Sequence, residues 1–342
     1  MPKPDDVVGQ AALHDFRDVL EEEDALPLGE QRFEEFVLGA FEESAWCRRD
    51  PFVITERDAL SYSWERFREV VMHENRYFFT PIVAGDPGPD LVHEGIEMLR
   101  QIGGLIEKYG LIREVGPGAD LHRVRTHDAG KEYTTAAELG TPPRDRASQN
   151  RMSPAGIEML YVATDRDTAL SETLTPNDLG RVASASVFHL RQELRVVDFD
   201  GVPEIPSIFD PDESAIAERN AIGFLLGFRR DLSRPIERDD RIHIEYVPTQ
   251  VVCEYLKTRF NPEGGLVHGL AFDSARIGCG RNWAFFIGHG YCVDPGQQVF
   301  FKDRAVAELA EVERLSVDEA LLDRLGVELA SSLDPDRDEI DR

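Results

Sequence analysis

Two arginines occupy alternate positions of the short string LHRVR at 121–125. Such a string predicts a β-strand, and side chains two residues apart on a strand point to the same face. We therefore expect Arg123 and Arg125 on one face, flanking Val124. Two guanidinium groups placed in this way suit the binding of phosphate or carboxylate, because each group can donate two parallel hydrogen bonds. The alternative is a pair of surface arginines on an edge strand.

A second string, RMSPAGIEMLYVATDRDTALSET at 151–173, combines a cation, an aromatic ring and a carboxylate. Tyr161 ends an apolar run, a position that core aromatics occupy more often than rings that stack on a ligand. Glu172 lies on the short helix expected after that run, where a glutamate is more often solvated than functional. Taken one at a time, these residues do not predict a site.

A serine and a glycine-rich loop follow in the string GLAFDSARIGCGRNWAFF at 269–286. Ser274 comes directly after a strand-like run, but no G-x-S-x-G sequence surrounds it, so a hydrolase-type nucleophile is not expected. The run Gly278-Cys279-Gly280 is by itself too weak a pattern to predict a phosphate-binding loop.

Composition limits the classes of function. The formal net charge is −27 over 342 residues, which repels nucleic-acid backbones and argues against non-specific nucleic-acid binding. The four cysteines lack metal-ligand spacing, so we expect reduced, mostly buried thiols and neither a disulfide framework nor a metal site. No apolar run is long enough for a membrane span, and the start MPKPDDVVGQ lacks the features of a secretory signal. We therefore expect a soluble cytoplasmic protein without a membrane partner.

Hydrophobic periodicity predicts a change of architecture near residue 112. Amphipathic helices are expected at about 30–43, 61–76 and 91–109, which predicts a small all-α domain over 1–112. Over 113–302 short strands alternate with helices, which predicts an α+β domain with a mixed or mainly antiparallel sheet. The expected strands are 121–125, 159–163, 183–190, 194–199, 242–247, 269–273 and 283–287. The expected helices are 168–174 (capped by Asp165 or Asp167), 214–226 and 249–258. Residues 303–342 are expected to be helical and then strongly acidic, with a partly disordered end.

In their order and spacing the strings resemble the RES domain family, which is named for an Arg, a Glu and a Ser. Its members share an aromatic-x-Arg string, a Gly-Arg-Met/Trp-Asn-Pro-x-Gly segment, Tyr-x-Ala, Thr-Ala-x-x-Glu, and later a Ser before a glycine-rich Asn loop. The corresponding residues here are Leu121-His122-Arg123, 150–156, Tyr161, Ala163, Thr168, Ala169, Glu172, Asp273-Ser274 and Gly280-Arg281-Asn282. The resemblance covers residues from about 121 to 300. His122, Asn150 and Ser153 replace the usual aromatic, Gly and Asn, which affects substrate contacts more than the fold.

The resemblance implies a fold similar to ADP-ribosyltransferases of the diphtheria-toxin class, and an enzyme that degrades NAD. Characterised relatives cleave the nicotinamide–ribose bond with water or phosphate as acceptor, and a RES toxin normally has an antitoxin partner. The leaving group is already a cationic pyridinium, so no general acid is needed to expel it. One carboxylate suffices to stabilise the oxocarbenium-like sugar. NAD is then the substrate, and neither a metal nor a separate cofactor is implied.

The resemblance also implies a role for each of the four catalytic candidates. Glu172 would contact the ribose hydroxyls and stabilise the developing positive charge. Arg123 would bind the phosphates or the ribose of NAD. Tyr161 would stack on the nicotinamide or the ribose, and Ser274 would bond to the ribose or hold Glu172 in place.

Four further residues are implied in binding NAD. They are Arg125, Arg151, Arg281 and Asn282. An acidic protein can hold an anionic substrate only where its pocket is locally rich in arginine, and these arginines with Arg123 are expected to make it so.

The front of the chain resembles a helical domain related to HEPN domains, often found ahead of RES. HEPN ribonucleases use an Arg-x4-His motif, and Arg68 and His73 have that spacing. The alternative, two residues on one helix face that pack against the second domain, is favoured because the spacing arises easily by chance. Two other functions stay open: a HEPN-type ribonuclease with RES as an NAD sensor, and an ADP-ribosyltransferase acting on a macromolecule. A protein antitoxin and a homo-oligomer are the expected partners.

Overall fold

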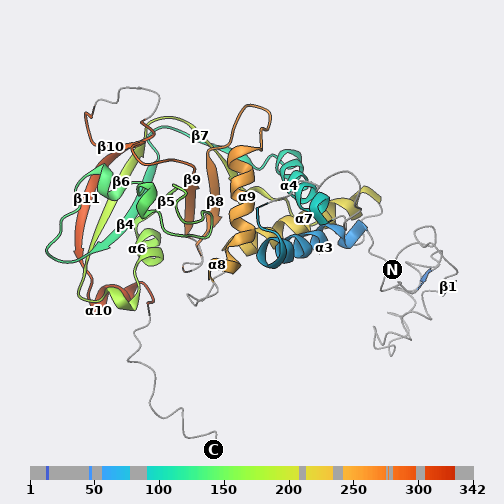
Figure 1. Ribbon diagram of the computed structural model, residues 1–342, viewed down its shortest axis with the longest axis horizontal. Helices are drawn as coiled ribbons and strands as arrows, with labels where there is room; N and C mark the ends of the chain where they lie inside the picture. Colours follow the sequence, from blue (N-terminus) through green and yellow to red (C-terminus); the bar gives the residue numbers. More distant parts are fainter. Residues whose placement is uncertain are drawn as a thin grey trace, which may run out of the picture. The chain divides into compact units, whose positions relative to one another are not determined.

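The computed structural model in Figure 1 describes most of the chain after residue 55. The described residues are 13–14, 46–47, 56–77, 91–207, 213–233, 242–274, 276, 280–297 and 305–327. The chain divides into two compact units, 1–59 and 60–342. In the first, β1 (Leu13–His14) pairs with β2 (Trp46–Cys47) in antiparallel fashion. The helix expected at 30–43 lies outside the described residues.

The second unit is built on a mixed sheet, as the sequence predicted. Nine strands are described, in the order β10-β11-β6-β4-β5-β9-β8-β7-β3. Their bounds are β3 (Ile112–Val115), β4 (Asp120–His127), β5 (Leu160–Ala163), β6 (Val182–Leu190), β7 (Leu194–Asp198), β8 (Gly269–Asp273), β9 (Arg281–Phe285), β10 (Cys292–Val293) and β11 (Ala307–Ser316). The β7–β8 and β10–β11 pairs are parallel, and the others are antiparallel.

The two middle strands of this sheet barely pair. β4 forms a long ladder with β6, and β5 forms one with β9, but β4 and β5 share only the pair His122–Ala163. Backbone groups of β5 near this junction therefore lack a strand partner on one side and must bond to something else.

Each face of the sheet is covered by its own apolar cluster. On one face, Val124 and Ala163 pack with α6 (Arg166–Thr173) and with α10 (Glu319–Arg324). On the other, Leu121 and Phe188 pack with α5 (Ala136–Leu139). The alternation of side chains along β4 therefore assigns each of its residues to one of the two faces.

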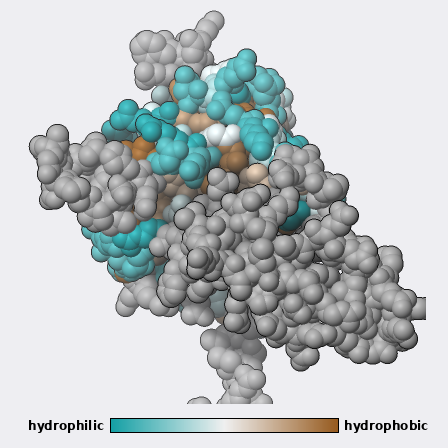
Figure 2. Space-filling model, turned by 90° about the vertical axis from the view of Figure 1, so that its right-hand side faces the viewer, coloured by the Kyte–Doolittle hydropathy of each residue, from teal (hydrophilic) through white to brown (hydrophobic). Residues whose placement is uncertain are grey.

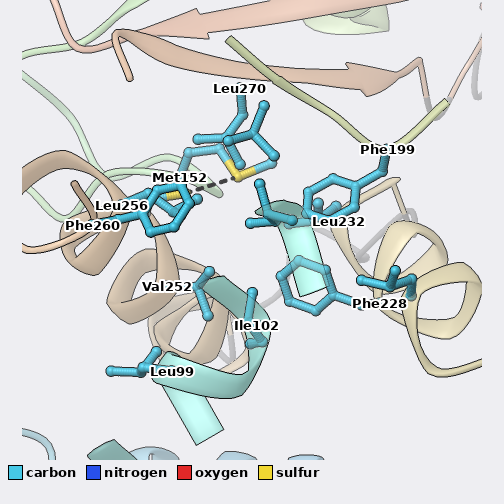
Figure 3. Close-up of a cluster of buried hydrophobic side chains, with 14 of the residues drawn as sticks. Leu99, Ile102, Met152, Phe199, Phe228, Leu232, Val252, Leu256, Phe260 and Leu270 are labelled. Atoms are coloured by element: carbon cyan, nitrogen blue, oxygen red, sulfur yellow. Dashed lines mark hydrogen bonds between the residues drawn. The ribbon is translucent and has the colours of Figure 1, made fainter. Parts of the chain in front are cut away.

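A third and larger cluster joins the helices to the β8 and β9 end of the sheet. It involves α3 (Glu56–Glu69), α4 (Leu91–Lys108), α7 (Glu213–Ser233) and α9 (Val247–Thr258). Figure 3 shows Leu99 and Ile102 of α4 facing Val252 and Leu256 of α9. A buried stripe at helical spacing (Met98, Ile102 and Ile106) gives α4 its apolar face. α4 precedes residue 112, so the core continues across the domain boundary expected there.

Two elements differ from the sequence prediction. Residues 242–247, expected as a strand, begin with the short helix α8 (Ile242–Glu245), which leads directly into α9. The alternating run IHIEYV looks like a strand, but it leads into α9, whose residues Val247 and Val252 are buried in the large apolar cluster, and this tertiary packing prevails over the local pattern. Residues 307–316, expected as helix, form β11, because nine of its residues pair with β6. The acidic end of the chain lies outside the described residues.

The described surface is polar. In Figure 2 the described surface is mostly hydrophilic, with small apolar areas between polar ones. None of the described helices is long and apolar enough to cross a membrane.

Candidate functional site

The Glu172 carboxylate is held by two side chains from the β8–β9 region. Ser274 Oγ donates a hydrogen bond of 2.6 Å to Glu172 Oε1, and Asn282 Nδ2 donates one of 3.0 Å to the same oxygen. Among the described residues, Oε2 of Glu172 has no hydrogen-bond partner. Within the described part of the chain, the protein therefore engages the carboxylate of Glu172 through one oxygen only.

The helix that bears Glu172 is fixed at both ends. At its start, Asp165 accepts hydrogen bonds from the backbone N–H (2.8 Å) and the hydroxyl (2.7 Å) of Thr168, so Asp165 rather than Asp167 is the cap. At its end, Arg276 donates bonds of 2.8 Å to the carbonyls of Ser171 and Leu174. A cation at the carbonyl end of a helix is favoured by the helix dipole. Arg276 was missed from the sequence, because its partners lie about a hundred residues away.

The two ends of the β8–β9 connection, Ser274 and Gly280, lie close to each other and to α6. Ser274 N–H donates to the Gly280 carbonyl at 2.8 Å. A Cβ at Gly280 would lie 2.5 Å from Thr168 Oγ1 and 3.1 Å from Ser274 Cβ, so only glycine fits without a shift. The glycine therefore permits the close approach that brings Ser274 to Glu172.

The register of β9 separates Asn282 from Arg281. Asn282 pairs with Ala163 and is directed to Glu172. Arg281 instead forms ion pairs with Asp198 (2.5 Å) and Asp200 (3.0 Å). The two aspartates compensate the charge of Arg281. The side chain of Arg281, which we expected to bind NAD, therefore has other partners than Glu172.

Arg151 interacts electrostatically with Glu172. Burial lowers the pKa of Arg151, and the charges of Tyr246 and Glu172 act in the opposite direction. Its guanidinium lies 5.7 Å from the centre of the Tyr246 ring, a cation–π arrangement. Tyr246, between α8 and α9, was not among the residues we expected at the site.

The segment that carries Arg151 is anchored in the core. Met152 is fully buried, and its sulfur lies 3.5 Å from Cys253 Sγ (Figure 3). Two side chains of α9 also bind this segment: Thr249 Oγ1 donates to the Arg151 carbonyl at 2.7 Å, and Gln250 Nε2 donates to the Asn150 carbonyl at 2.8 Å. The position of Arg151 thus depends on α9.

Tyr161 lies on the same face of β5 as Ala163, the residue paired with Asn282. Its hydroxyl is 2.9 Å from Ser153 Oγ. Burial raises the pKa of Tyr161 above its ordinary value, so the phenol is neutral near pH 7.

Arg123 is directed away from Glu172. Val124 packs against α6, and Leu121 packs on the opposite face, so alternation places Arg123 on the face opposite α6. Its Nη1 donates a 2.5 Å bond to the Tyr161 carbonyl at the open β4–β5 junction, and its Nε is buried without a partner among the described residues. Burial, with a contribution from Arg125, lowers the pKa of Arg123 to about 10.

Arg125 shares the face of Arg123, as the sequence predicted. The two pair in register with Ser184 and Ser186 of β6, with Val124 between them. Burial lowers the pKa of Arg125 as well. The structure therefore brings Ser274 and Asn282 into contact with Glu172, with Tyr161 on the same face of the sheet and Arg151 in electrostatic interaction with the carboxylate. It places Arg123 and Arg125 on the opposite face.

The remaining predicted features can be located as well. Arg68 lies 3.7 Å from Asp231, and His73 is exposed in a π-helical turn, Val70–Glu74. Cys253 and Cys292 are buried free thiols. Within the described part of the chain, no three His, Cys, Asp or Glu side chains are grouped as metal ligands.

The chain matches two family models: the RES domain over residues 120–299 and HEPN/RES N-terminal domain 1 over residues 7–84. Both resemblances seen in the sequence are thereby confirmed. No curated protein and no solved structure matches the chain significantly. The first match contains Glu172 and all the residues that hold it, and it spans more than half of the 342 residues. The chain therefore belongs to the RES domain family, which is generally linked to NAD-degrading toxins.

Proposed function

We propose that this protein is an enzyme that cleaves NAD at the nicotinamide–ribose bond, with water or phosphate as acceptor. The observation that carries the proposal is the Glu172 carboxylate in the RES segment, oriented by Ser274 and Asn282 through one oxygen only. A toxin in a toxin–antitoxin or phage-defence system is the biological role that fits such an activity, with a protein antitoxin and a second copy of the chain as its partners.

A carboxylate that the protein holds through one oxygen, as Glu172 is, suits cleavage of the nicotinamide–ribose bond. Nicotinamide leaves from a pyridinium that is already cationic, so the reaction requires stabilisation of positive charge on the ribose rather than proton donation. Glu172 Oε1 is fixed by two donors, which orients Oε2 toward a ribose hydroxyl and toward the developing charge. No second carboxylate is needed, in contrast to glycosidases.

Arg151 is the residue that we propose binds the phosphates of NAD. The negative charge of Glu172 favours the charged form of Arg151, so the two groups lie within electrostatic reach, and a phosphate bound to Arg151 would bring the nicotinamide ribose toward the carboxylate. Tyr161 lies on the same face and offers a neutral ring to the nicotinamide or the ribose. We assign Arg123 an indirect role: it fixes β5 through the Tyr161 carbonyl.

The test is nicotinamide release from NAD by purified protein, with and without phosphate. Glu172→Gln keeps the size and hydrogen-bonding capacity of the side chain but removes its charge. We expect it to lower kcat by about a hundredfold to a thousandfold. Glu158→Gln is the matched control, because Glu158 is also a half-buried carboxylate that accepts bonds, from Arg144 and from the His289 N–H.

The products distinguish the acceptors and the alternative reactions. ADP-ribose indicates water, its phosphorylated form indicates phosphate, and labelled ADP-ribose on protein or nucleic acid indicates a transferase. Wild-type protein that releases no nicotinamide under any of these conditions would refute the proposal.

A further inference from the structure

The position of Arg151 depends on the last turn of α7. Arg151 Nη1 donates to the Leu232 carbonyl at 2.8 Å and approaches the Asp231 carbonyl at 3.4 Å. Carbonyls in the last turn of a helix have no amide partner within the helix, and the helix dipole favours a cation beside them. A shift of this turn would therefore carry the Arg151 guanidinium with it, or break its hydrogen bonds.

The same turn is held from the other side by α3. Trp64 Nε1 donates a 2.8 Å bond to Asp231 Oδ2, and Arg68 Nη1 lies 3.7 Å from that oxygen. The Trp64 ring also meets Phe228 of α7 edge-on, with 5.0 Å between ring centres. Asp231 of α7 thus contacts α3 through its side-chain carboxylate, and its backbone carbonyl lies 3.4 Å from Arg151 Nη1.

We propose that α3 positions Arg151 through Asp231, which makes Trp64 and Arg68 positioning residues for NAD cleavage. The inference rests on the proposed function and extends it. Trp64 and Arg68 belong to the segment that matches HEPN/RES N-terminal domain 1, and Arg151 belongs to the RES segment. The front segment then serves to hold the NAD-binding cation at the correct distance from Glu172, and Arg68 works through an ion pair.

Three variants of α3 separate this role from a general effect on stability. Arg68→Ala should raise KM for NAD about fivefold while kcat stays within about twofold, because it displaces a group that binds substrate in ground and transition states alike. Arg68→Lys keeps the charge and should restore most of the affinity. Arg66→Ala is the matched control: Arg66 lies on the same helix, bonds to Glu74, and its side chain is 26% exposed, against 27% for Arg68.

The deciding measurement is a double-mutant cycle between Arg68 and Arg151. If α3 acts through Arg151, Arg68→Ala should raise KM no further once Arg151→Ala is present. Nicotinamide riboside, which lacks the phosphates, supplies a second readout, because its KM should respond little to Arg68→Ala. Thermal unfolding followed by circular dichroism shows whether each variant is folded. If Arg68→Ala is not folded, Arg68→Gln replaces it in the cycle, because it removes the charge that pairs with Asp231 but keeps much of the side chain.

The outcomes separate the two proposals. Active wild-type protein with additive effects of Arg68→Ala and Arg151→Ala would overturn this inference alone. Wild-type protein without nicotinamide release would overturn the proposed function, and this inference with it.

Discussion

Replacing Gly280 by alanine should lower both the stability of the protein and its activity. The added Cβ would lie 2.5 Å from Thr168 Oγ1, 2.9 Å from Thr168 Cγ2 and 3.1 Å from Ser274 Cβ. Overpacking of this kind in a close-packed region typically costs about 1–3 kcal/mol. Thr168 cannot turn away freely, because its hydroxyl is bonded to the helix cap Asp165 at 2.7 Å. Loss of such a cap would itself cost about 1 kcal/mol.

We therefore expect Gly280→Ala to lower the free energy of unfolding by roughly 2–3 kcal/mol. Activity should fall as well, since the third close contact is with Ser274, which holds Glu172. Urea unfolding measures the first effect, and nicotinamide release measures the second. Gly104→Ala is the control: Gly104 lies in α4 with open space around its Cβ position, so alanine there should be neutral or mildly stabilising.

Removal of the atoms that clash shows whether they cause the loss of stability. Thr168→Ala eliminates both threonine atoms that approach within 3 Å of the added Cβ, at the cost of the cap interaction. In that background, Gly280→Ala should cost much less than in the wild type. If the two substitutions instead destabilise the protein additively, the clash with Thr168 is not the cause.

Three other predictions concern the single side chains of Ser274, His73 and His268. Ser274→Ala removes the 2.6 Å bond to Glu172 and should lower kcat about tenfold with little change in KM; an unchanged kcat would show that Asn282 alone orients the carboxylate. His73→Ala should leave nicotinamide release unaltered because His73 is exposed, whereas loss of an RNA-cleaving activity in this variant would favour the ribonuclease alternative. Burial, with a smaller effect of Arg195, lowers the pKa of His268 below 6.5, and its Nδ1 accepts a bond from the Arg195 N–H (3.0 Å). As the pH falls, the His268 imidazole is therefore protonated at a higher pH in the unfolded chain than in the folded protein. The free energy of unfolding should fall as the pH drops below about 6.5, and His268→Gln should reduce that pH dependence. Urea unfolding at pH 5 to 8 measures both effects.

Local sequence patterns were sufficient for most elements and for the central carboxylate. The strand-like string at 121–125 and the apolar run at 159–163 form β4 and β5, and α6 begins at the cap Asp165. These features depend on neighbours within a few residues, such as side-chain alternation along a strand and a capping bond from residue i to i+3. Glu172 was identified because the order and spacing of several strings match a family.

Tertiary structure decided which residues share the site, since that depends on register and on contacts far apart in the sequence. Two adjacent residues of β9 have different partners: Asn282 donates a hydrogen bond to Glu172, and Arg281 forms an ion pair with Asp198. Arg123 lies on the opposite face of the sheet, and Arg151 is the arginine whose pKa is lowered by burial and raised by the charge of Glu172. A shift of one residue along a strand reverses the face of a side chain, and no local pattern encodes where strands meet.

The same reason explains the elements that were mispredicted and the residues that were missed. β11 has a helix-like composition, and it is a strand because β6 offers an edge to pair with. Arg276 and Asp231 gave no signal in the sequence, since each acts through partners about eighty or more residues away. The sequence by itself thus determined the family, the main elements and the acid at the centre of the site. The packing of α6, α7 and α9 on the sheet determined which cations and hydrogen-bond donors surround that acid.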